Sequence, residues 1–208
     1  MNRSRPDHYA DRARQAGYPP RSVYKLEEIQ KKFHVLRHGQ KVLDIGAAPG
    51  SWTMYASEQV GRDGRITAVD LKECSIEDRR GNIQVLEGDA FTEIIQNELK
   101  KSAPYDTILS DAAPSTTGNR MVDTARSAGL AEQCIETART MLAPGGSMVI
   151  KIFQGGEEQN IVKQLRGLFR NIKAFKPGSS RKDSFELFLV STGFLGAKNN
   201  GKGDIENG

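Results

Sequence analysis

The stretch VLDIGAAPGSW, from Val42 to Trp52, decides the expected fold of this 208-residue chain. Its apolar start predicts a buried strand, its glycines predict a tight turn, and its end predicts the first residues of a helix. Turns of this kind usually hold a nucleotide. This turn, however, has neither the G-x-G-x-x-G order of a dinucleotide site nor the G-K-[ST] end of a P-loop. Its ligand must be identified from the strands that follow.

Strands and helices alternate along the chain. We expect strands at residues 42–45, 65–69, 83–86, 105–109, 147–153, 172–175 and 185–191, and helices at residues 22–33, 51–60, 92–100, 122–142 and 157–169. This alternation favours an α/β fold with a mostly parallel sheet and helices on both faces. The last two strands have no helix between them, so we expect them to pair antiparallel at a sheet edge. Ser22 is a candidate N-cap of the first helix.

The composition is typical of a soluble globular protein, with 37% hydrophobic and 27% charged residues. No apolar run reaches the roughly 18 residues of a membrane span, and the start MNRSRPDHYA lacks the apolar region of a signal peptide. Cys74 and Cys134 lie far apart, so we expect two free thiols in the reducing cytoplasm. We expect a single domain over residues 1–194 and a disordered tail at residues 195–208, which has almost no apolar content.

Basic residues are concentrated near the N-terminus. Residues 1–40 form an arm with nine Lys or Arg and four Asp or Glu, whereas the whole chain has a net charge of +4. On charge alone, this arm is compatible with a polyanionic partner and equally with an ordinary solvated extension.

Acidic residues follow the strands at the edge where the glycine turn is expected. Gly46 and Gly50 let the backbone come close to a ligand. Asp70 can accept both hydroxyls of an adenosine ribose, Asp89 can bind the adenine amino group, and Asp111 follows the fourth strand. We expect these loops to supply acids and no lysine, which suits the sulfonium of S-adenosylmethionine better than the phosphates of NAD. The alternative is that the acids are ordinary turn residues.

Three further charged residues stand out. Lys151 lies within the strand MVIKIF and Glu186 within SFELFLV, where a charge is costly unless it is paired or functional. The alternative for Lys151 is a side chain that reaches water past the strand end. Lys25 lies on the first turn of a helix, where solvent exposure is the simple alternative. All three histidines precede the glycine turn, which argues against a Ser-His-Asp triad, and we expect no metal site.

Five segments together resemble the FtsJ family of ribosomal RNA 2′-O-ribose methyltransferases: RSVYKLEEI, VLDIGAAPGSW, SDAAP, LAPGGSMVIKIFQG and KPGSSRKDSFELFLV. They follow one another in family order over nearly the whole chain apart from the tail. The resemblance implies a seven-stranded class I methyltransferase fold with an antiparallel last strand and S-adenosylmethionine as the cofactor. The residues that it implies are a catalytic tetrad at Lys25, Asp111, Lys151 and Glu186, and cofactor contacts at Gly50, Trp52, Asp70, Asp89 and Asp111.

Two positions depart from the family pattern. Ser51 replaces the second glycine of the usual P-G-G-W, and a hydroxyl at a helix start can cap the helix. Phe188 replaces a frequent tyrosine two residues after Glu186, so the hydroxyl group of that tyrosine is absent here.

The resemblance implies methylation of a ribose 2′-hydroxyl, with a uridine of 23S ribosomal RNA in the large ribosomal subunit as the target. We assign Lys151 as the base, oriented by the carboxylates, while Lys25 binds the substrate or tunes Lys151. Transfer RNA or another ribosomal site is the nearest alternative. A non-catalytic RNA-binding protein and a nicotinamide oxidoreductase are more distant ones.

Basic residues of the arm and of the loop KPGSSRKDS are expected to hold the RNA backbone, because arginine and lysine bind phosphate. These expected contacts are Arg12, Arg14, Arg21, Lys176, Arg181 and Lys182. We further expect a cytoplasmic monomer with no membrane partner.

Overall fold

The computed structural model of the chain describes residues 22–181 and 183–196. These residues form a seven-stranded sheet in the order β3-β2-β1-β4-β5-β7-β6. The strands are β1 (Lys41–Ile45), β2 (Arg65–Asp70), β3 (Ile83–Glu87), β4 (Tyr105–Ser110), β5 (Leu142–Phe153), β6 (Phe169–Phe175) and β7 (Glu186–Phe194). The helices are α2 (Val23–Phe33), α3 (Ser51–Val60), α4 (Glu93–Ser102), α5 (Arg120–Met141) and α6 (Glu158–Arg166).

The strands β1 to β5 pair in parallel, and β7 runs antiparallel between β5 and the edge strand β6. The register of the β5–β7 pair places Lys151 opposite Phe188 and Phe153 opposite Glu186. The expected α/β class, the parallel sheet and the antiparallel last strand are therefore confirmed.

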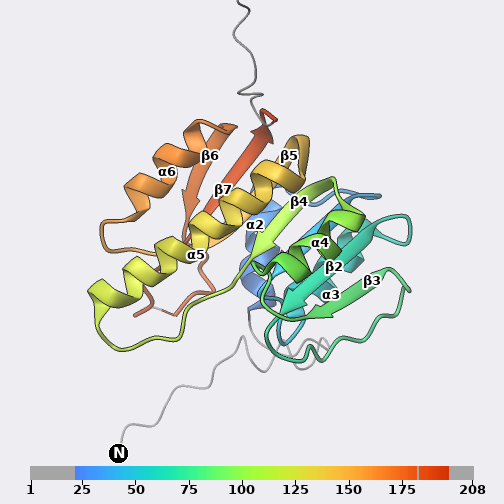
Figure 1. Cartoon of the computed structure of the whole chain (residues 1–208), viewed down its shortest axis with the longest axis horizontal. Helices are drawn as coiled ribbons and strands as arrows, with labels where there is room; N and C mark the ends of the chain where they lie inside the picture. Colours follow the sequence, from blue (N-terminus) through green and yellow to red (C-terminus); the bar gives the residue numbers. More distant parts are fainter. Residues whose placement is uncertain (1–21, 182, 197–208) are drawn as a thin grey trace, which may run out of the picture.

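Apolar side chains alternate between two cores, one on each face of the sheet. Met148 and Ile150 of β5 belong to the core under α4, α5 and α6, whereas Val149 belongs to the core under α2 and α3. Such alternation follows from the two-residue period of a strand. Figure 1 shows α4, α5 and α6 in front of the sheet and α2 and α3 behind it.

Several element boundaries differ from the sequence prediction. The helix α5 begins at Arg120 because the side chain of Asn119 accepts hydrogen bonds from the N–H groups of Met121 and Val122. The strand β5 begins at Leu142, which pairs with Tyr105 across an irregularity in the register. The segment APGG, which falls between the expected helix at residues 122–142 and the expected strand at residues 147–153, thus lies inside a long strand.

The side chains of the two serines expected at helix starts make no capping hydrogen bonds. Ser22 is the N-cap residue of α2, as expected, but its side chain makes no capping hydrogen bond, and Gly50, not Ser51, is the N-cap of α3. The Oγ atoms of Ser22 and Ser51 instead lie 2.7 Å apart, and the indole N–H of Trp52 donates to the Ser22 carbonyl at 2.9 Å. These contacts fix α2, which carries Lys25, against α3.

Cys74 and Cys134 are free thiols, as expected, and the latter is buried. Within residues 22–181 and 183–196, no helix is long and apolar enough to cross a membrane. Several positions of the sequence predictions lie outside the described residues: Arg12, Arg14, Arg21, Lys182 and most of the expected tail, positions 197–208.

Candidate active site

A cavity of about 900 Å³ lies at the carboxyl ends of β1, β2 and β4. Parallel α/β sheets bind ligands at this edge, and the volume falls within the roughly 300–1,000 Å³ of small-molecule sites. Four of the expected cofactor residues line the cavity: Gly46, Asp70, Asp89 and Asp111. The turn after β1 and the loops after β2, β3 and β4 therefore meet there, as the sequence predicted.

The two glycines of the turn are required by close contacts with neighbouring loops. Gly46 has a φ of +77°, and a Cβ atom there would lie 2.5 Å from the Cβ of Ala112. Gly50 has a φ of +115°, and a Cβ atom there would lie 2.4 Å from Cγ1 of Ile76. Both positions therefore exclude other residues. Gly46 borders the cavity, whereas Gly50 lies outside its lining.

Asp70 holds the two loops that enclose one side of the cavity. Its Oδ2 accepts the N–H of Ala48 and its Oδ1 accepts the N–H of Lys72, each at 2.9 Å. Each carboxylate oxygen can accept a second hydrogen bond. Asp70 can therefore also bind two hydroxyl groups of a ligand from the cavity side.

Asp89 has a similar arrangement, in which one of its oxygens has no hydrogen-bond partner among the described residues. Its Oδ1 accepts the N–H of Phe91 at 3.0 Å. The expectation that acids alone line this region is wrong, because Lys72 and Arg126 also border the cavity. Two cations suit a ligand that carries a carboxylate as well as a sulfonium. In the part of the chain that the structure describes, no group of three or more His, Cys, Asp or Glu could hold a metal ion.

Trp52 lies outside the cavity lining and is only 2% exposed. Its ring packs against that of Phe188 with the centroids 5.6 Å apart. Phe188 is fully buried at this position, so the residue that departs from the family pattern packs in the core beneath α2 and α3. The structure thus places Trp52 as a link between α2, α3 and β7.

The strand residues of the expected tetrad share one face of the sheet, because side chains alternate along a strand. Phe188 and Val149 belong to the core under α2 and α3. Glu186 lies two residues before Phe188, and Lys151 lies two residues after Val149. Asp111 follows Leu109 of the same core by two residues. The helix α2, which carries Lys25, packs on this face.

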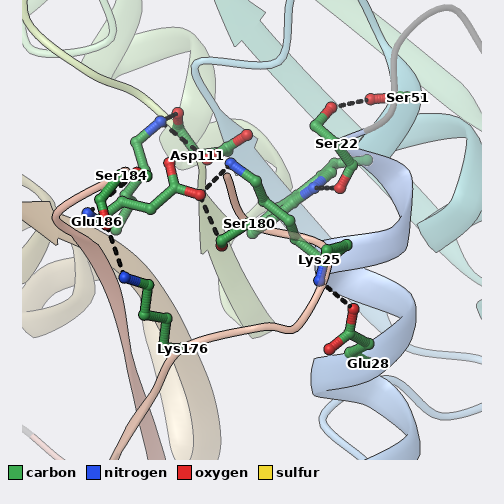
Figure 2. Close-up of polar contacts among 12 residues, drawn as sticks. Ser22, Lys25, Glu28, Ser51, Asp111, Lys176, Ser180, Ser184 and Glu186 are labelled. Atoms are coloured by element: carbon green, nitrogen blue, oxygen red, sulfur yellow. Dashed lines mark hydrogen bonds and ion pairs between the residues drawn. The ribbon is translucent and has the colours of Figure 1, made fainter. Parts of the chain in front are cut away.

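The four residues form two ion pairs. Lys25 Nζ lies 2.6 Å from Glu186 Oε1, and Lys151 Nζ lies 2.9 Å from Asp111 Oδ1. Lys151 also donates to the Asp111 carbonyl at 2.5 Å. The side chains are 10–18% exposed, and charges with so little contact with water require partners. Figure 2 shows Lys25 of α2 reaching Glu186 of β7.

Glu186 is ionised at neutral pH. Burial opposes its charge, but the hydrogen bond and ion pair with Lys25, together with the hydrogen bond from Ser180, hold its pKa below the ordinary glutamate value. Lys25 Nζ also lies 5.7 Å from the centroid of the Phe188 ring, within cation–π range. The phenylalanine at this position therefore contacts Lys25 without a hydroxyl group.

Asp111 connects the two parts of the site. It lines the cavity and its carboxylate holds Lys151. A ligand whose reactive atom reaches Asp111 would therefore lie next to the Lys151 amine. This geometry suits proton removal from a second substrate at the border of the cavity.

Asp44 is a further unusual residue, which the sequence prediction missed. It is fully buried, accepts a hydrogen bond from Thr53 Oγ1 at 2.6 Å, and has no partner for Oδ1 among the described residues. Burial raises the pKa of Asp44 to about 7 against that hydrogen bond, and the nearby carboxylates of Asp111 and Asp70 add to the rise. An acid inside the apolar strand VLDI was the signal that could have identified it.

Two of the expected RNA contacts, Lys176 and Arg181, are described and exposed, and both lie between β6 and β7. The ammonium group of Lys176 donates to the carbonyl of Ser184 at 2.7 Å. Lys176 therefore joins the two ends of the connection between β6 and β7.

Comparisons with known proteins agree with this architecture. A family model described as FtsJ-like methyltransferase matches residues 18–194. The "Ribosomal RNA large subunit methyltransferase E" of Treponema denticola is 48% identical over 93% of this chain and 97% of its own length. The protein of that name from Desulfatibacillum aliphaticivorans is 49% identical over 88% of each chain.

Solved structures show the same fold. A crystal structure described as a ribosomal RNA methyltransferase from Plasmodium falciparum has a TM-score of 0.74 at 28% identity, over 86% of this chain and 100% of that one. Aeropyrum pernix fibrillarin, with natively bound S-adenosyl-L-methionine, has a TM-score of 0.60 at 20% identity, over 82% and 76% of the two chains. The chain therefore belongs to the FtsJ-like methyltransferase family, and the expected family and the expected cofactor, S-adenosylmethionine, are confirmed.

Proposed function

We propose that the chain transfers a methyl group from S-adenosylmethionine to the 2′-hydroxyl of a uridine ribose in 23S RNA of the large ribosomal subunit. The relatives named as large-subunit ribosomal RNA methyltransferases support the choice of RNA. The choice of a ribose hydroxyl as the methyl acceptor rests on the position of Asp111, which borders the cofactor cavity and holds the Lys151 amine. The free thiols are consistent with a cytoplasmic enzyme, which we expect to act as a monomer.

Lys151 is the base in this proposal. When held beside Gly46, Asp70 and Asp89, S-adenosylmethionine would supply an electrophilic methyl group and a thioether leaving group. Lys151 Nζ takes the hydroxyl proton after the ammonium of the ion pair has released one of its own protons to water, and Asp111 orients the resulting amine through its carboxylate and its carbonyl. Proton removal by a positioned base contributes roughly 10²–10⁴-fold, and alignment of the reactants can contribute about 7–11 kcal/mol.

Lys25 and Glu186 complete the site on the substrate side. Glu186 fixes the Lys25 ammonium group through the 2.6 Å ion pair. A fixed ammonium group can donate hydrogen bonds to the ribose or to a neighbouring phosphate. We assign substrate positioning to Lys25 for this reason.

The cofactor residues have separate roles. Asp70 accepts hydrogen bonds from the ribose hydroxyls while it holds Ala48 and Lys72, and Asp89 binds the adenine amino group through its free oxygen. Gly46 gives the cofactor room beside the turn. Gly50 and Trp52 act from outside the cavity lining, because they support the turn and the start of α3.

The RNA backbone is held by the arm and by the connection between β6 and β7. Arg181 is exposed there, and the arm contributes its arginines next to Lys25 in the sequence. Such contacts hold the backbone without reading the bases, so target selection would depend on the shape of the RNA.

Methyl transfer from labelled S-adenosylmethionine tests this function. Purified 23S RNA, assembled large subunits and bulk transfer RNA are compared as substrates, with Lys151→Ala as the inactive control. Label in 23S RNA or in large subunits, absent with the control variant, is the expected result. Label in transfer RNA alone would establish the alternative substrate, and RNA binding without label in any sample would establish a non-catalytic protein.

A further inference from the structure

The carboxylate of Glu28 binds a segment that lies 150 residues further along the chain. Glu28 lies on α2 one turn after Lys25. Its Oε2 accepts the N–H of Gly178 at 2.6 Å, and its Oε1 accepts the N–H of Ser179 at 2.9 Å. Hydrogen bonds to an ionised carboxylate are stronger than those between neutral groups. Glu28 therefore fixes the backbone of this segment, which precedes β7.

The fixed segment contacts the tetrad through the next residue. Ser180 Oγ donates to Glu186 Oε1 at 2.8 Å, and the same oxygen lies 2.6 Å from Lys25 Nζ. Lys25 and Glu28 belong to one helix, so these contacts form a closed ring through α2, residues 178–180 and β7. Its four side chains are those of Lys25, Glu28, Ser180 and Glu186. Figure 2 shows Glu28 and Lys25 on the same helix, with Ser180 between that helix and Glu186.

The burial of the ring explains why its contacts must be maintained. Ser180 is 9% exposed and Glu186 is 8% exposed, so water does not readily replace a lost contact between them. The N–H of Glu186 is also bonded to Ser184 Oγ, at 3.2 Å. The side of the ring at Gly178 is exposed, and there the Glu28 carboxylate holds the segment to the helix.

We infer that Glu28 is a positioning residue of the methyl-transfer site. It fixes residues 178–180 so that Ser180 holds the Glu186 carboxylate on Lys25. Glu28 does not line the cofactor cavity, so it acts on the reaction through Ser180 and Glu186. The catalytic part of this inference rests on the proposed function, whereas the effect of Glu28 on Glu186 does not.

The neighbouring residue Glu27 provides a matched control on the same helix. Glu27 pairs with Lys31 on the surface of α2, with Lys31 70% exposed. A Glu27→Gln variant changes the charge of α2 by the same amount as Glu28→Gln but leaves the ring intact. Both glutamines keep the length of the side chain, and Ser180→Ala removes the next contact of the ring.

The first experiment measures the pKa of Glu186 by NMR titration of carboxyl-labelled glutamate in the full chain. Both Ser180→Ala, which removes the Ser180 hydrogen bond to the Glu186 carboxylate, and Glu28→Gln, which releases the segment that positions Ser180, should raise the pKa of Glu186 above the wild-type value. Glu27→Gln should leave it unchanged. A Glu186 pKa that responds to Ser180→Ala and not to Glu28→Gln would overturn the inference. This outcome does not depend on whether the chain methylates RNA.

The second experiment measures methyl transfer to RNA at saturating cofactor. Glu28→Gln should lower kcat by about tenfold or more, because small misplacements of reacting groups have large effects on rate. Its affinity for S-adenosylmethionine should stay within about twofold of wild type. The kcat of the double variant Glu28→Gln/Ser180→Ala should be no lower than that of the less active single variant, because both substitutions act through one contact. Losses that multiply would show that Glu28 does not act through Ser180. An inactive wild type with a responsive Glu186 would overturn the proposed function and leave the ring standing.

Discussion

The carboxylates in the cofactor-binding half of the site and those in its catalytic half have different partners. In the cofactor half, Asp70 and Asp89 line the cavity and Asp44 is buried in β1 beside it, and none of the three forms an ion pair with any other described residue. In the catalytic half, Asp111 and Glu186 each pair with a lysine. The consequence is visible in the pKa values, since burial raises that of Asp44 to about 7 while Lys25 holds that of Glu186 low.

This difference teaches how the two halves are used. Asp70 and Asp89 can receive the hydroxyl and amino groups of a ligand from the cavity, and their negative charge favours a sulfonium nearby. The catalytic half has its charges already matched, so its side chains are held in place before a substrate arrives. Fixed polar groups of this kind need no rearrangement during the reaction.

The largest effect is expected in the catalytic half. Lys151→Ala removes the proposed base and should lower the rate of methyl transfer by about 10²–10⁴-fold. The affinity for S-adenosylmethionine should persist, because Lys151 does not line the cavity. Single-turnover rates and calorimetric titration separate the two quantities. A variant that keeps more than a tenth of the wild-type rate would exclude Lys151 as the base.

The next largest effect is expected in the cofactor half. Asp70→Ala removes hydrogen bonds to a ribose, each worth roughly 1.5–3 kcal/mol, and it also releases the N–H groups of Ala48 and Lys72. We expect about a hundredfold weaker binding of S-adenosylmethionine by calorimetry. Part of the rate should return at high cofactor concentration, unlike in Lys151→Ala. An affinity within about twofold of wild type would remove Asp70 from the cofactor site.

The unpaired acid Asp44 should make stability depend on pH. Its pKa rises from 3.8 to about 7 in the folded chain, so the folded state binds the proton more tightly. The resulting stabilisation is complete below the unfolded pKa and is lost as the pH rises through about 7. Asp44→Asn should remove this dependence. The free energy of unfolding of the variant, measured relative to wild type, should therefore increase by a few kcal/mol from pH 4 to pH 8. Urea denaturation at several pH values measures it, and a constant difference would contradict the assignment.

The smallest effect is expected from the arm. Replacing Arg12, Arg14 and Arg21 together with alanine should leave cofactor affinity intact and weaken RNA binding. If each arginine meets one phosphate, the slope of log affinity against log salt should become shallower by about 2–3 units. Arg139→Ala on α5, where Arg139 pairs with Glu136, serves as the control. An unchanged slope and affinity would mean that the arm is a solvated extension.

The cofactor half could be predicted from the residues themselves, because it is built from neighbouring segments. Apolar strands ending at a glycine turn and at Asp70 are signals within a short window, and the parallel sheet brings their ends together. The missed features there depend on three-dimensional packing, such as the burial of Asp44 and the presence of Arg126 from α5 in the cavity.

The catalytic half could not be derived from local patterns. Lys25 looked like a surface residue until α2 was placed against β7, and only the family resemblance grouped it with Glu186. Gly178 and Ser179, which Glu28 contacts, lie 150 and 151 positions further along the chain, so no local sequence pattern could predict these contacts. The start of β5 was misplaced because strand pairing overrode the turn signal of APGG.

The position of the transferred methyl group tests the central claim most directly. Large-subunit RNA that has been modified by the chain with labelled S-adenosylmethionine is digested to nucleosides, which are separated and weighed by mass spectrometry. The proposed function predicts label in 2′-O-methyluridine, with Lys151 and Asp111 at the cavity border acting on the ribose hydroxyl. Label on the uracil ring, with the ribose unmodified, would contradict the account.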